Sequence, residues 1–255
     1  MHVLFWGCGN MAGALGEGLR RARRDWRFTC WTPTGTQARA LAGKIGGAFL
    51  DTEKIPSDVT AVVLGFKPQN LAEAGPALAA RLPAGCLVVS LLAAVSRERL
   101  AEIFPGHPTL RLMPNLAIAT GDGVVLWEGD AAGGWREALG SMGLALETKP
   151  ALLDVYTLMG ASSPAFLYRW LQEAGEFAQA RGASADEAVA LMSQAFRAAL
   201  KETTPHAALA GKISTVASKG GVTQAVLDRW QEVGPKHMVE GLAAGLKRMD
   251  ELKRG

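Results

Sequence analysis

Short apolar runs alternate with amphipathic segments through the first half of the chain. The runs predict seven β-strands, at residues 3–6, 26–31, 61–66, 86–91, 109–113, 123–127 and 145–148. The continuous apolar runs at 61–66 and 86–91 are typical of central parallel strands that are covered on both faces. Because helical segments separate the first strands, residues 1–149 are predicted to form an α/β domain with a mostly parallel sheet.

Strand patterns stop near Lys149 and Pro150, and only amphipathic helical periodicity follows. Six helices are predicted, at residues 152–158, 164–181, 184–200, 207–216, 221–232 and 235–253. One boundary is marked clearly, since Gly182 ends a helix, Ser184 caps the next and Glu187 completes a capping box. Residues 150–255 are therefore predicted to form a second, all-helical domain.

Composition and charge narrow the class of protein. The chain has 255 residues, 49% hydrophobic and 20% charged, as is ordinary for a globular protein with a sizeable core. A net charge of +3 is too small to indicate nucleic-acid binding, and the basic cluster in residues 20–24 ends a predicted helix, where cations suit the helix dipole. No signal peptide or membrane span is recognisable. Cys8, Cys30 and Cys86 lack metal-ligand spacing, so we expect no metal site, and reduced thiols in a cytoplasmic protein.

A glycine-rich turn follows the first strand. Gly7, Gly9 and Ala12 form the pattern Gly-x-Gly-x-x-Ala just before a helical run. In a dinucleotide-binding turn the first glycine supplies unusual backbone angles, the second lets a pyrophosphate approach, and a small third residue lets helix pack on strand. The first-turn N–H groups of the helix then bind the anion. The sequence predicts a Rossmann-type nucleotide site here, and the open alternative is a βα turn without a ligand.

The end of the second strand bears on the choice of cofactor. NAD-binding units place an acidic residue there to hold the ribose 2′-hydroxyl, whereas this chain has Thr32, Pro33 and Thr34. A hydroxyl-rich loop with Arg39 one turn further on can accept a 2′-phosphate, which favours NADPH and leaves NADH possible. In the alternative interpretation, Thr34 only caps the helix that follows.

Two further stretches place polar groups where a ligand could bind. Lys67 follows a central strand at its carboxyl end, where open α/β sheets bind ligands, and it could stabilise negative charge or only support the loop. Gly220 and Gly221 precede a helix, so free backbone N–H groups up to Thr223 could receive a carboxylate. A capped helix start explains the same residues without a ligand. The four histidines share no spacing and are predicted to be structural or solvated.

Six motifs occur in order along nearly the whole chain. They are Gly7-Cys8-Gly9-Asn10-Met11, Phe66-Lys67-Pro68-Gln69, Ser90 to Val95, Arg111-Leu112-Met113-Pro114-Asn115, Ser162 to Phe166 and Ser218 to Thr223. Together and in this order they resemble the motifs of the pyrroline-5-carboxylate reductase family. The departures are Leu116-Ala117 where the family has Thr-Pro, Gly160-Ala161-Ser162-Ser163-Pro164 where it has Ser-Gly-Ser-Gly-Pro, and Lys219 and Val222 where it often has Pro and Thr.

The resemblance implies an activity and a set of site residues. The activity is NADPH-dependent reduction of 1-pyrroline-5-carboxylate to L-proline, in proline biosynthesis, by hydride transfer to a cyclic imine. The implied cofactor-binding residues are Gly7, Cys8, Gly9, Asn10, Met11, Ala12, Thr32, Thr34, Gly65, Lys67, Pro68, Ala93 and Asn115. The implied substrate-binding residues are Ser163, Gly220, Gly221, Val222 and Thr223. In this interpretation backbone N–H groups of residues 221–223 hold the substrate carboxylate, and the catalytic Thr223 hydroxyl reaches the ring nitrogen as a proton donor or an orienting group.

The resemblance also implies an assembly, because the family's helical domain pairs with that of a second subunit. We expect a homodimer, or a ring built of such dimers, with a small-molecule substrate and neither nucleic acid nor membrane as a partner. The apolar positions of residues 152–200 could supply the interface or, alternatively, a monomeric core. Two other functions stay open. One is NADPH-dependent reduction of another cyclic imine or carbonyl compound, with Leu116 and Ser163 reshaping the pocket, and the other is non-catalytic nucleotide sensing.

Overall fold

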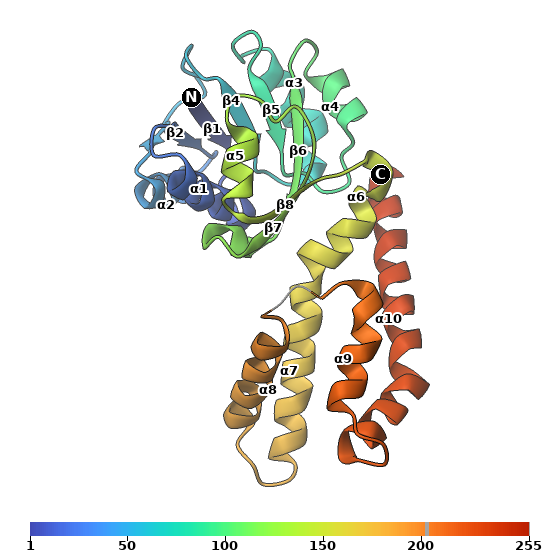
Figure 1. Cartoon of the computed structure of the whole chain (residues 1–255). Helices are drawn as coiled ribbons and strands as arrows, with labels where there is room; N and C mark the ends of the chain where they lie inside the picture. The colour runs from blue at the N-terminus through green and yellow to red at the C-terminus, as the bar shows by residue number, and fades with distance from the viewer. Residues whose placement is uncertain (202–203, 255) are drawn as a thin grey trace. The chain divides into compact units, whose positions relative to one another are not determined.

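The computed structural model describes residues 1–201 and 204–254 (Figure 1). Contacts divide the chain into two compact units, of which the first combines Met1–Ser162 with Leu246–Gly255 and the second is Ser163–Gly245. This division falls later than the predicted boundary between residues 149 and 150. The reason is the helix α6 (Pro150–Thr157), which belongs to the first unit.

Two contacts hold α6 in the first unit. Its residue Leu153 is fully buried against Met113 and Leu126 of the sheet. Its residue Asp154 forms an ion pair with Lys253, close to the end of the chain. The last helical segments of the first unit therefore come from two parts of the sequence, one before and one after the second unit.

Eight strands form one sheet in the first unit, in the order β3-β2-β1-β4-β5-β6-β7-β8. They are β1 (His2–Trp6), β2 (Arg27–Trp31), β3 (Ala48–Phe49), β4 (Ala61–Leu64), β5 (Leu87–Ser90), β6 (Thr109–Pro114), β7 (Gly123–Gly129) and β8 (Gly143–Glu147). Neighbours are parallel except β6 and β7, which pair antiparallel with Leu112 opposite Trp127. Every residue of β1, β4 and β5 is buried, which explains their continuous apolar sequence. All seven predicted strands are present, and the two-residue β3 adds the eighth.

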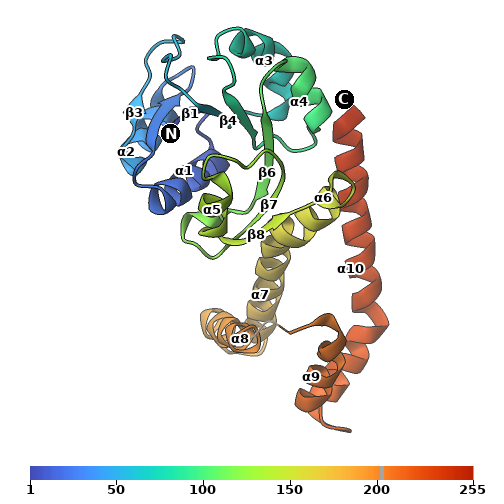
Figure 2. The same cartoon turned by 45° about the horizontal axis from the view of Figure 1, so that its top comes forward.

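Helices cover both faces of the sheet (Figure 2). Val3 and Phe5 of β1 pack into a core with α1 (Asn10–Ala22), α2 (Thr36–Ile45) and α5 (Trp135–Gly140). Leu4 and Trp6 point to the opposite face, where α3 (Leu71–Ala79) and α4 (Arg97–Ile103) complete a second core. This arrangement confirms the predicted fold class, a Rossmann-type α/β domain followed by helices.

The arginines at the end of α1 bind carbonyl groups of neighbouring segments. Arg20 donates from Nε to the carbonyl oxygen of Ile45 at 2.5 Å, at the end of α2. Arg21 donates to the carbonyl oxygens of Ile118, at 3.2 Å, and Ala119. These guanidinium groups satisfy the last carbonyls of the two segments, so the basic cluster has a structural role at this helix end.

His2 anchors the beginning of β1 through a buried polar network. Its Nδ1 lies 3.1 Å from the Asp58 carboxylate and its Nε2 lies 2.8 Å from the Thr29 hydroxyl. Burial lowers the pKa of His2, and the charges of Arg27 and the N-terminus lower it further. The imidazole is therefore held in its neutral form at neutral pH.

A continuous helical segment leads out of the first unit. α6 passes into a π-helical turn at Leu158–Ser162, and α7 (Ser163–Gln179) begins at the next residue. α6 ends within one residue of the predicted end at Leu158, but the predicted break before the next helix is wrong. The chain instead continues with one extra residue per turn, which small residues such as Gly160 allow where they press against a neighbouring strand.

The second unit consists of helices only. Its elements are α7, α8 (Ala185–Ala199), α9 (Leu209–Val216) with a 3-10 turn at His206–Ala208, and most of α10 (Val222–Arg254). Ser184 caps α8 as predicted, with its hydroxyl accepting a hydrogen bond from the Glu187 N–H at 3.3 Å. None of the helices in residues 1–201 and 204–254 combines the length and apolar content that a membrane span requires.

α10 contradicts the predicted break between residues 232 and 235. It continues through Gly234 and Pro235 as a single helix. A Cβ at Gly234 would lie 2.5 Å from the indole of Trp230, so this glycine makes room for a ring. The Nδ1 of His237 lies 2.5 Å from the carbonyl oxygen of Val233. Because these local contacts support the helix around the proline, Pro235 does not end it.

Candidate functional site

The carboxyl ends of β1 and β4 bring two glycines into backbone contact. Gly7 has a φ of +97°, and a Cβ built there would lie 2.5 Å from the backbone nitrogen of Phe66. A Cβ on Gly65 would overlap the carbonyl oxygen of Gly7 and lie 2.8 Å from the Cβ of Ala12. Neither glycine has room for a side chain, and Ala12 is buried beside them. The predicted roles of Gly7 and Ala12 in shaping the turn therefore have a geometric basis.

Gly9 leaves the beginning of α1 uncovered. It is the N-cap of the helix, no side chain caps the first turn, and that turn holds no acidic residue. A Cβ on Gly9 would meet only the carbonyl oxygen of Gly65, at 3.8 Å. A cavity of about 320 Å³ lies against this turn, and Cys8, Gly9 and Asn10 are among its lining residues. The cavity thus borders the positive end of the helix dipole, where an anion could bind, and continues between α1 and α2 as far as Glu17 and Lys44.

The loop after β2 holds a buried hydroxyl without a partner. Thr32 is 7% exposed, and its Oγ1 has no hydrogen-bond partner among the described residues. Thr34 is exposed, and the N-cap of α2 is Gly35, with no side-chain cap. The alternative that Thr34 caps α2 is therefore wrong. The guanidinium of Arg39 stacks on the ring of Phe49 at 3.9 Å, beside this loop.

Cys8 bonds within the protein. A hydrogen bond with the Cys30 thiol lowers the pKa of Cys8 and raises that of Cys30, whose burial raises it further. The Sγ of Cys8 also lies 3.7 Å from the carbonyl oxygen of Trp31. Because the thiol is engaged with β2, any contact of Cys8 with a cofactor is expected from its backbone.

The loops after β4 and β5 carry further predicted cofactor residues. Lys67 is exposed, caps nothing with its side chain, and precedes Pro68, which begins a 3-10 turn at Pro68–Asn70. Ala93 is exposed as well. Its neighbour Ala94 has a φ of +62° and is the one non-glycine with a positive φ among the residues that the structure describes. Strained backbone of this kind clusters at functional sites, so Ala94 is a site candidate that the sequence did not predict.

Asn115 follows β6 and uses its amide inside the protein. Its Nδ2 donates to the carbonyl oxygen of Gly160 at 3.0 Å, and its Oδ1 accepts from the N–H of Val124 at 3.2 Å. The next residue, Leu116, is 55% exposed. The predicted contact of Asn115 with a cofactor stays a prediction, whereas its bonds to two other segments are observed.

The second glycine-rich loop forms the beginning of α10. Gly220 has a φ of +74°, and the N–H of Gly221 donates to the carbonyl oxygen of Ser218 at 2.9 Å. Val222 and Thr223, the first residues of α10, are exposed. The loop therefore presents the first-turn N–H groups of a 33-residue helix, as a carboxylate receptor requires.

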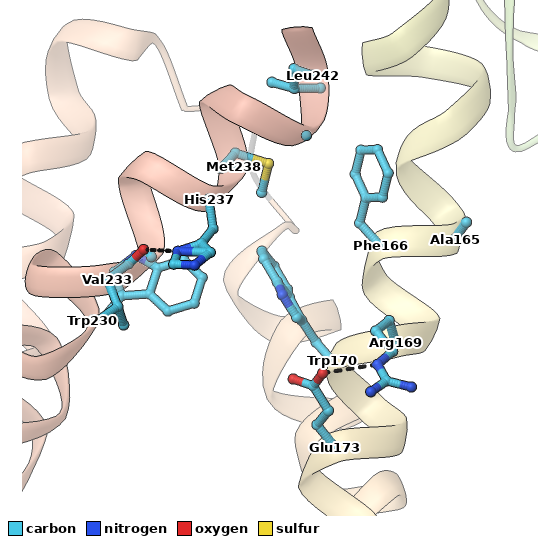
Figure 3. Close-up of a pocket in the computed structure, with 12 residues that line it drawn as sticks. Ala165, Phe166, Arg169, Trp170, Glu173, Trp230, Val233, His237, Met238 and Leu242 are labelled. Atoms are coloured by element: carbon cyan, nitrogen blue, oxygen red, sulfur yellow. Dashed lines mark hydrogen bonds and ion pairs between the residues drawn. The ribbon is translucent and has the colours of Figure 1, made fainter. Parts of the chain in front are cut away.

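A groove of about 550 Å³ runs between α7 and α10 within the second unit (Figure 3). Phe166, Trp170, Met238 and Leu242 point into it from the two helices, with the Arg169–Glu173 ion pair at its edge. Trp170 meets Trp230 edge to face, with ring centroids 5.6 Å apart. None of the predicted site residues lines this groove.

The two predicted sets of site residues fall in different units of the chain. The cofactor set lies in the first unit, where Gly7, Ala12 and Gly65 touch. Of the substrate set, Ser163 begins α7 and the remaining members begin α10, in the second unit. Glu17, Gln37 and Lys44 also line the cavity beside α1, and no local pattern marks them because they are ordinary polar positions of two helices. The described residues contain no group of three His, Cys, Asp or Glu that could hold a metal ion.

Both parts of the chain match known family models. Residues 2–94 match the model described as NADP oxidoreductase, coenzyme F420-dependent, and residues 150–252 match that described as pyrroline-5-carboxylate reductase dimerisation. The pyrroline-5-carboxylate reductase of Pseudomonas aeruginosa is 29% identical over 272 aligned residues, covering 98% of this chain and 96% of that protein. That of Pisum sativum is 26% identical over 259 residues, covering 97% and 94%.

Solved structures share the fold along the whole chain. The 1-pyrroline-5-carboxylate reductase of Streptococcus pyogenes has a TM-score of 0.83 at 23% identity, covering 100% of this chain and 99% of that one. The pyrroline carboxylate reductase of Plasmodium falciparum, solved with NADP bound, has a TM-score of 0.83 at 17% identity, covering 99% and 98%.

The fold and these matches define a class of protein, the oxidoreductases that join a dinucleotide-binding domain to a C-terminal helical domain. Within that class, the chain is similar over nearly its whole length to pyrroline-5-carboxylate reductases, and its residues 150–252 match the dimerisation model of that family. The match extends over the whole length of its relatives, in agreement with the six motifs noted in the sequence.

Proposed function

We propose that the protein reduces 1-pyrroline-5-carboxylate to L-proline with NADPH. In this reaction the imine carbon of the ring gains a hydride and the ring nitrogen gains a proton, so that the C=N bond becomes a single bond. The observation that carries the proposal is the close contact of Gly7 and Gly65 together with Gly9, an N-cap residue without a side-chain cap at the beginning of α1. Such an arrangement suits the pyrophosphate of a dinucleotide.

The first unit fits the cofactor at two further points. NADPH, when bound, supplies the hydride. The buried Oγ1 of Thr32 has no partner among the described residues, and a ligand phosphate could provide one. Arg39, stacked on Phe49, stands beside that loop, and β2 ends without an acidic residue, which favours a 2′-phosphate over a 2′-hydroxyl. We assign the phosphates to residues 7–12, Thr32 and Thr34, and the nicotinamide end to the loops that carry Gly65, Lys67, Pro68 and Ala93.

The second unit offers a receptor for the substrate carboxylate. We assign this role to the backbone N–H groups of Val222 and Thr223, which begin α10 after the left-handed Gly220. The N–H of Gly221, predicted to share this role, is instead bonded to the carbonyl oxygen of Ser218. The Thr223 hydroxyl then orients the ring nitrogen or donates its proton. Catalysis by orientation alone is worth up to about 7–11 kcal/mol, and an iminium accepts hydride without a strong general base.

We further propose that the protein is a homodimer in which the second unit pairs with a second copy of this chain. Among the residues of 163–245 whose burial the structure describes, only Gly175, Ala217 and Gly234 are buried, and two of these have no side chain. Large apolar side chains stay exposed on α7 and α8, including Phe177 at 60% and Leu191 at 74%. So large an exposed apolar surface indicates an interface, and residues 150–252 match a dimerisation model. Sedimentation of the full chain distinguishes a monomer, a dimer and a ring of dimers.

The state of the cysteines supports a cytoplasmic location, which we also propose. All three thiols are free and buried, and burial raises the pKa of Cys86 to about 12. A fold without disulfides suits a reducing compartment. Fractionation of cells that express the protein, with a cytoplasmic marker enzyme as the reference, tests this location.

The activity is tested by oxidation of NADPH in the presence of 1-pyrroline-5-carboxylate, with other cyclic imines and 2-oxo acids as a comparison panel. Consumption of NADPH with equimolar L-proline as the product supports the proposal. If the protein turns over only a different imine or a carbonyl compound, that compound is its substrate and the proposal is wrong on this point. The exposed Leu116 could cause such a difference in substrate. Cofactor binding without turnover of any compound would favour a nucleotide-sensing protein.

A further inference from the structure

The π-helical turn at Leu158–Ser162 is held in place by β6 and β7. A Cβ on Gly160 would lie 2.8 Å from the Cγ1 of Val124, so the turn packs tightly against β7. The carbonyl oxygen of Gly160 accepts a hydrogen bond from the Nδ2 of Asn115 at 3.0 Å. π-Helical turns are uncommon and occur frequently at functional sites.

Asn115 can hold the π-helical turn against β7 because its side-chain amide both accepts and donates a hydrogen bond. Its backbone N–H donates to the carbonyl oxygen of Val124 at 3.0 Å, and its Oδ1 accepts from the N–H of the same residue at 3.2 Å. These two bonds extend the pairing of β6 and β7 by one residue and fix the side chain. The Nδ2 group is then aimed at Gly160, 45 residues further along the chain. An aspartate would keep the acceptor and lose this donor.

We propose that Asn115 is a positioning residue for substrate binding. It fixes the π-helical turn, whose last residue, Ser162, directly precedes Ser163, the first residue of α7. The inference rests on the proposed function, because Ser163 belongs to the substrate-binding residues that the family resemblance implies. In this role Asn115 contacts neither the substrate nor the cofactor, because its side-chain amide is bonded to Gly160 and Val124. The positioning role takes the place of the cofactor contact that the family resemblance implies for Asn115.

The test compares Asn115→Asp with Asn70→Asp in the full-length protein. Asn70 is exposed and its side chain caps nothing, so the control makes the same chemical change elsewhere in the same unit. In Asn115→Asp we expect the KM for 1-pyrroline-5-carboxylate to rise about 10- to 100-fold, because a small misplacement of substrate-contacting groups has effects of this size. The Kd of NADPH is expected to stay unchanged in Asn115→Asp, because the side-chain amide of Asn115 is bonded to Gly160 and Val124.

Two further readouts separate positioning from a general loss of stability. Hydrogen exchange in residues 158–164 is expected to quicken in Asn115→Asp and not in Asn70→Asp. The ratio of kcat/KM between Asn115→Asp and the unaltered protein is expected to recover as the pH falls toward about 4, where the new carboxyl is protonated and can donate to Gly160. A merely structural defect would not be repaired by acid.

The outcomes separate this inference from the proposed function. If the unaltered protein reduces 1-pyrroline-5-carboxylate and Asn115→Asp has the same KM, the positioning role is overturned while the proposed function stands. A joint rise of the NADPH Kd and the substrate KM would also overturn it, since it would point to a disturbed cofactor site. Lack of turnover by the unaltered protein overturns the proposed function and, with it, this role.

Discussion

Replacement of Gly9 by alanine is expected to weaken the binding of NADPH and to leave the stability of the fold nearly unchanged. Gly9 has a φ of −71° and a ψ of −177°, which alanine adopts freely, and the new Cβ would meet only the carbonyl oxygen of Gly65, at 3.8 Å. The free energy of unfolding is therefore expected to change by less than about 1 kcal/mol. The methyl group would instead stand where the first N–H groups of α1 are expected to meet the pyrophosphate.

The expected loss of affinity follows from the bonds that this methyl group displaces. A hydrogen bond to a charged group is worth about 1.5–3 kcal/mol, so loss of one such bond raises the Kd of NADPH about 10- to 150-fold. Isothermal titration calorimetry without any imine measures this constant, and a thermal melt measures stability. Gly43→Ala is the matched control, because Gly43 is an exposed residue of α2 with nothing within 4 Å of a built Cβ.

Three results distinguish the contributions of these glycines. Gly43→Ala is expected to stabilise α2 by about 0.5–1 kcal/mol and to leave the Kd of NADPH unchanged. Gly65→Ala is expected to destabilise the protein by about 4 kcal/mol or more, because its Cβ would overlap the backbone of Gly7. If Gly9→Ala folds normally and binds NADPH as tightly as the unaltered protein, the pyrophosphate lies elsewhere and the reasoning fails.

Three other perturbations have expected outcomes. Ala94→Gly should raise the thermal midpoint, because relief of the φ of +62° exceeds the added entropy of the unfolded glycine by about 0.5–1 kcal/mol. Leu191→Asp should convert dimers to monomers in sedimentation, since two leucines in a twofold interface contribute together about 4 kcal/mol, roughly a thousandfold in Kd. Stability should fall as the pH drops below about 6.5, because burial lowers the pKa of His2 in the folded protein and the unfolded chain takes up the proton first. His2→Asn should remove that part of the pH dependence from thermal melts.

Each of these outcomes has a control or a contrary result. A less stable Ala94→Gly variant would show that the positive φ is not strained. Gln194→Asp adds the same charge at another exposed position of α8, and it should leave the dimer intact. Dissociation of both variants would attribute the effect to charge and not to apolar contact. An unchanged acid slope in His2→Asn would assign the pH dependence to other groups.

The α/β part of the fold could be predicted because its pattern is local. Strands buried on both faces read as continuous apolar runs, and the glycine turn after β1 marks the beginning of a helix. β3 escaped prediction because it pairs through only Thr29 with Ala48 and Cys30 with Phe49, too short a stretch for any periodicity. In the helical part most boundaries were predicted to within two residues, whereas the number of helices was wrong because two predicted helices form the single helix α10.

The remaining errors and omissions depend on contacts between distant residues. Local rules placed breaks at Gly160 and at Pro235, whereas packing on Val124 and against Trp230 keeps the helices continuous. In the same way, the pattern Met-Pro-Asn indicated that Asn115 matters without indicating its bond to Gly160. The strain at Ala94 was also not predicted, since alanine carries no local signal of a positive φ.

Residues 163–245 bury very few of their residues, and this affects the stability of newly synthesised chains in the cell. Before it meets a partner, a newly synthesised subunit exposes Phe177, Leu191 and Leu200. Exposed hydrophobic surface of this kind is recognised by chaperones and proteases. Survival of the subunit then depends on how soon that surface is covered, so abundance in the cell is expected to rise more steeply than the rate of synthesis.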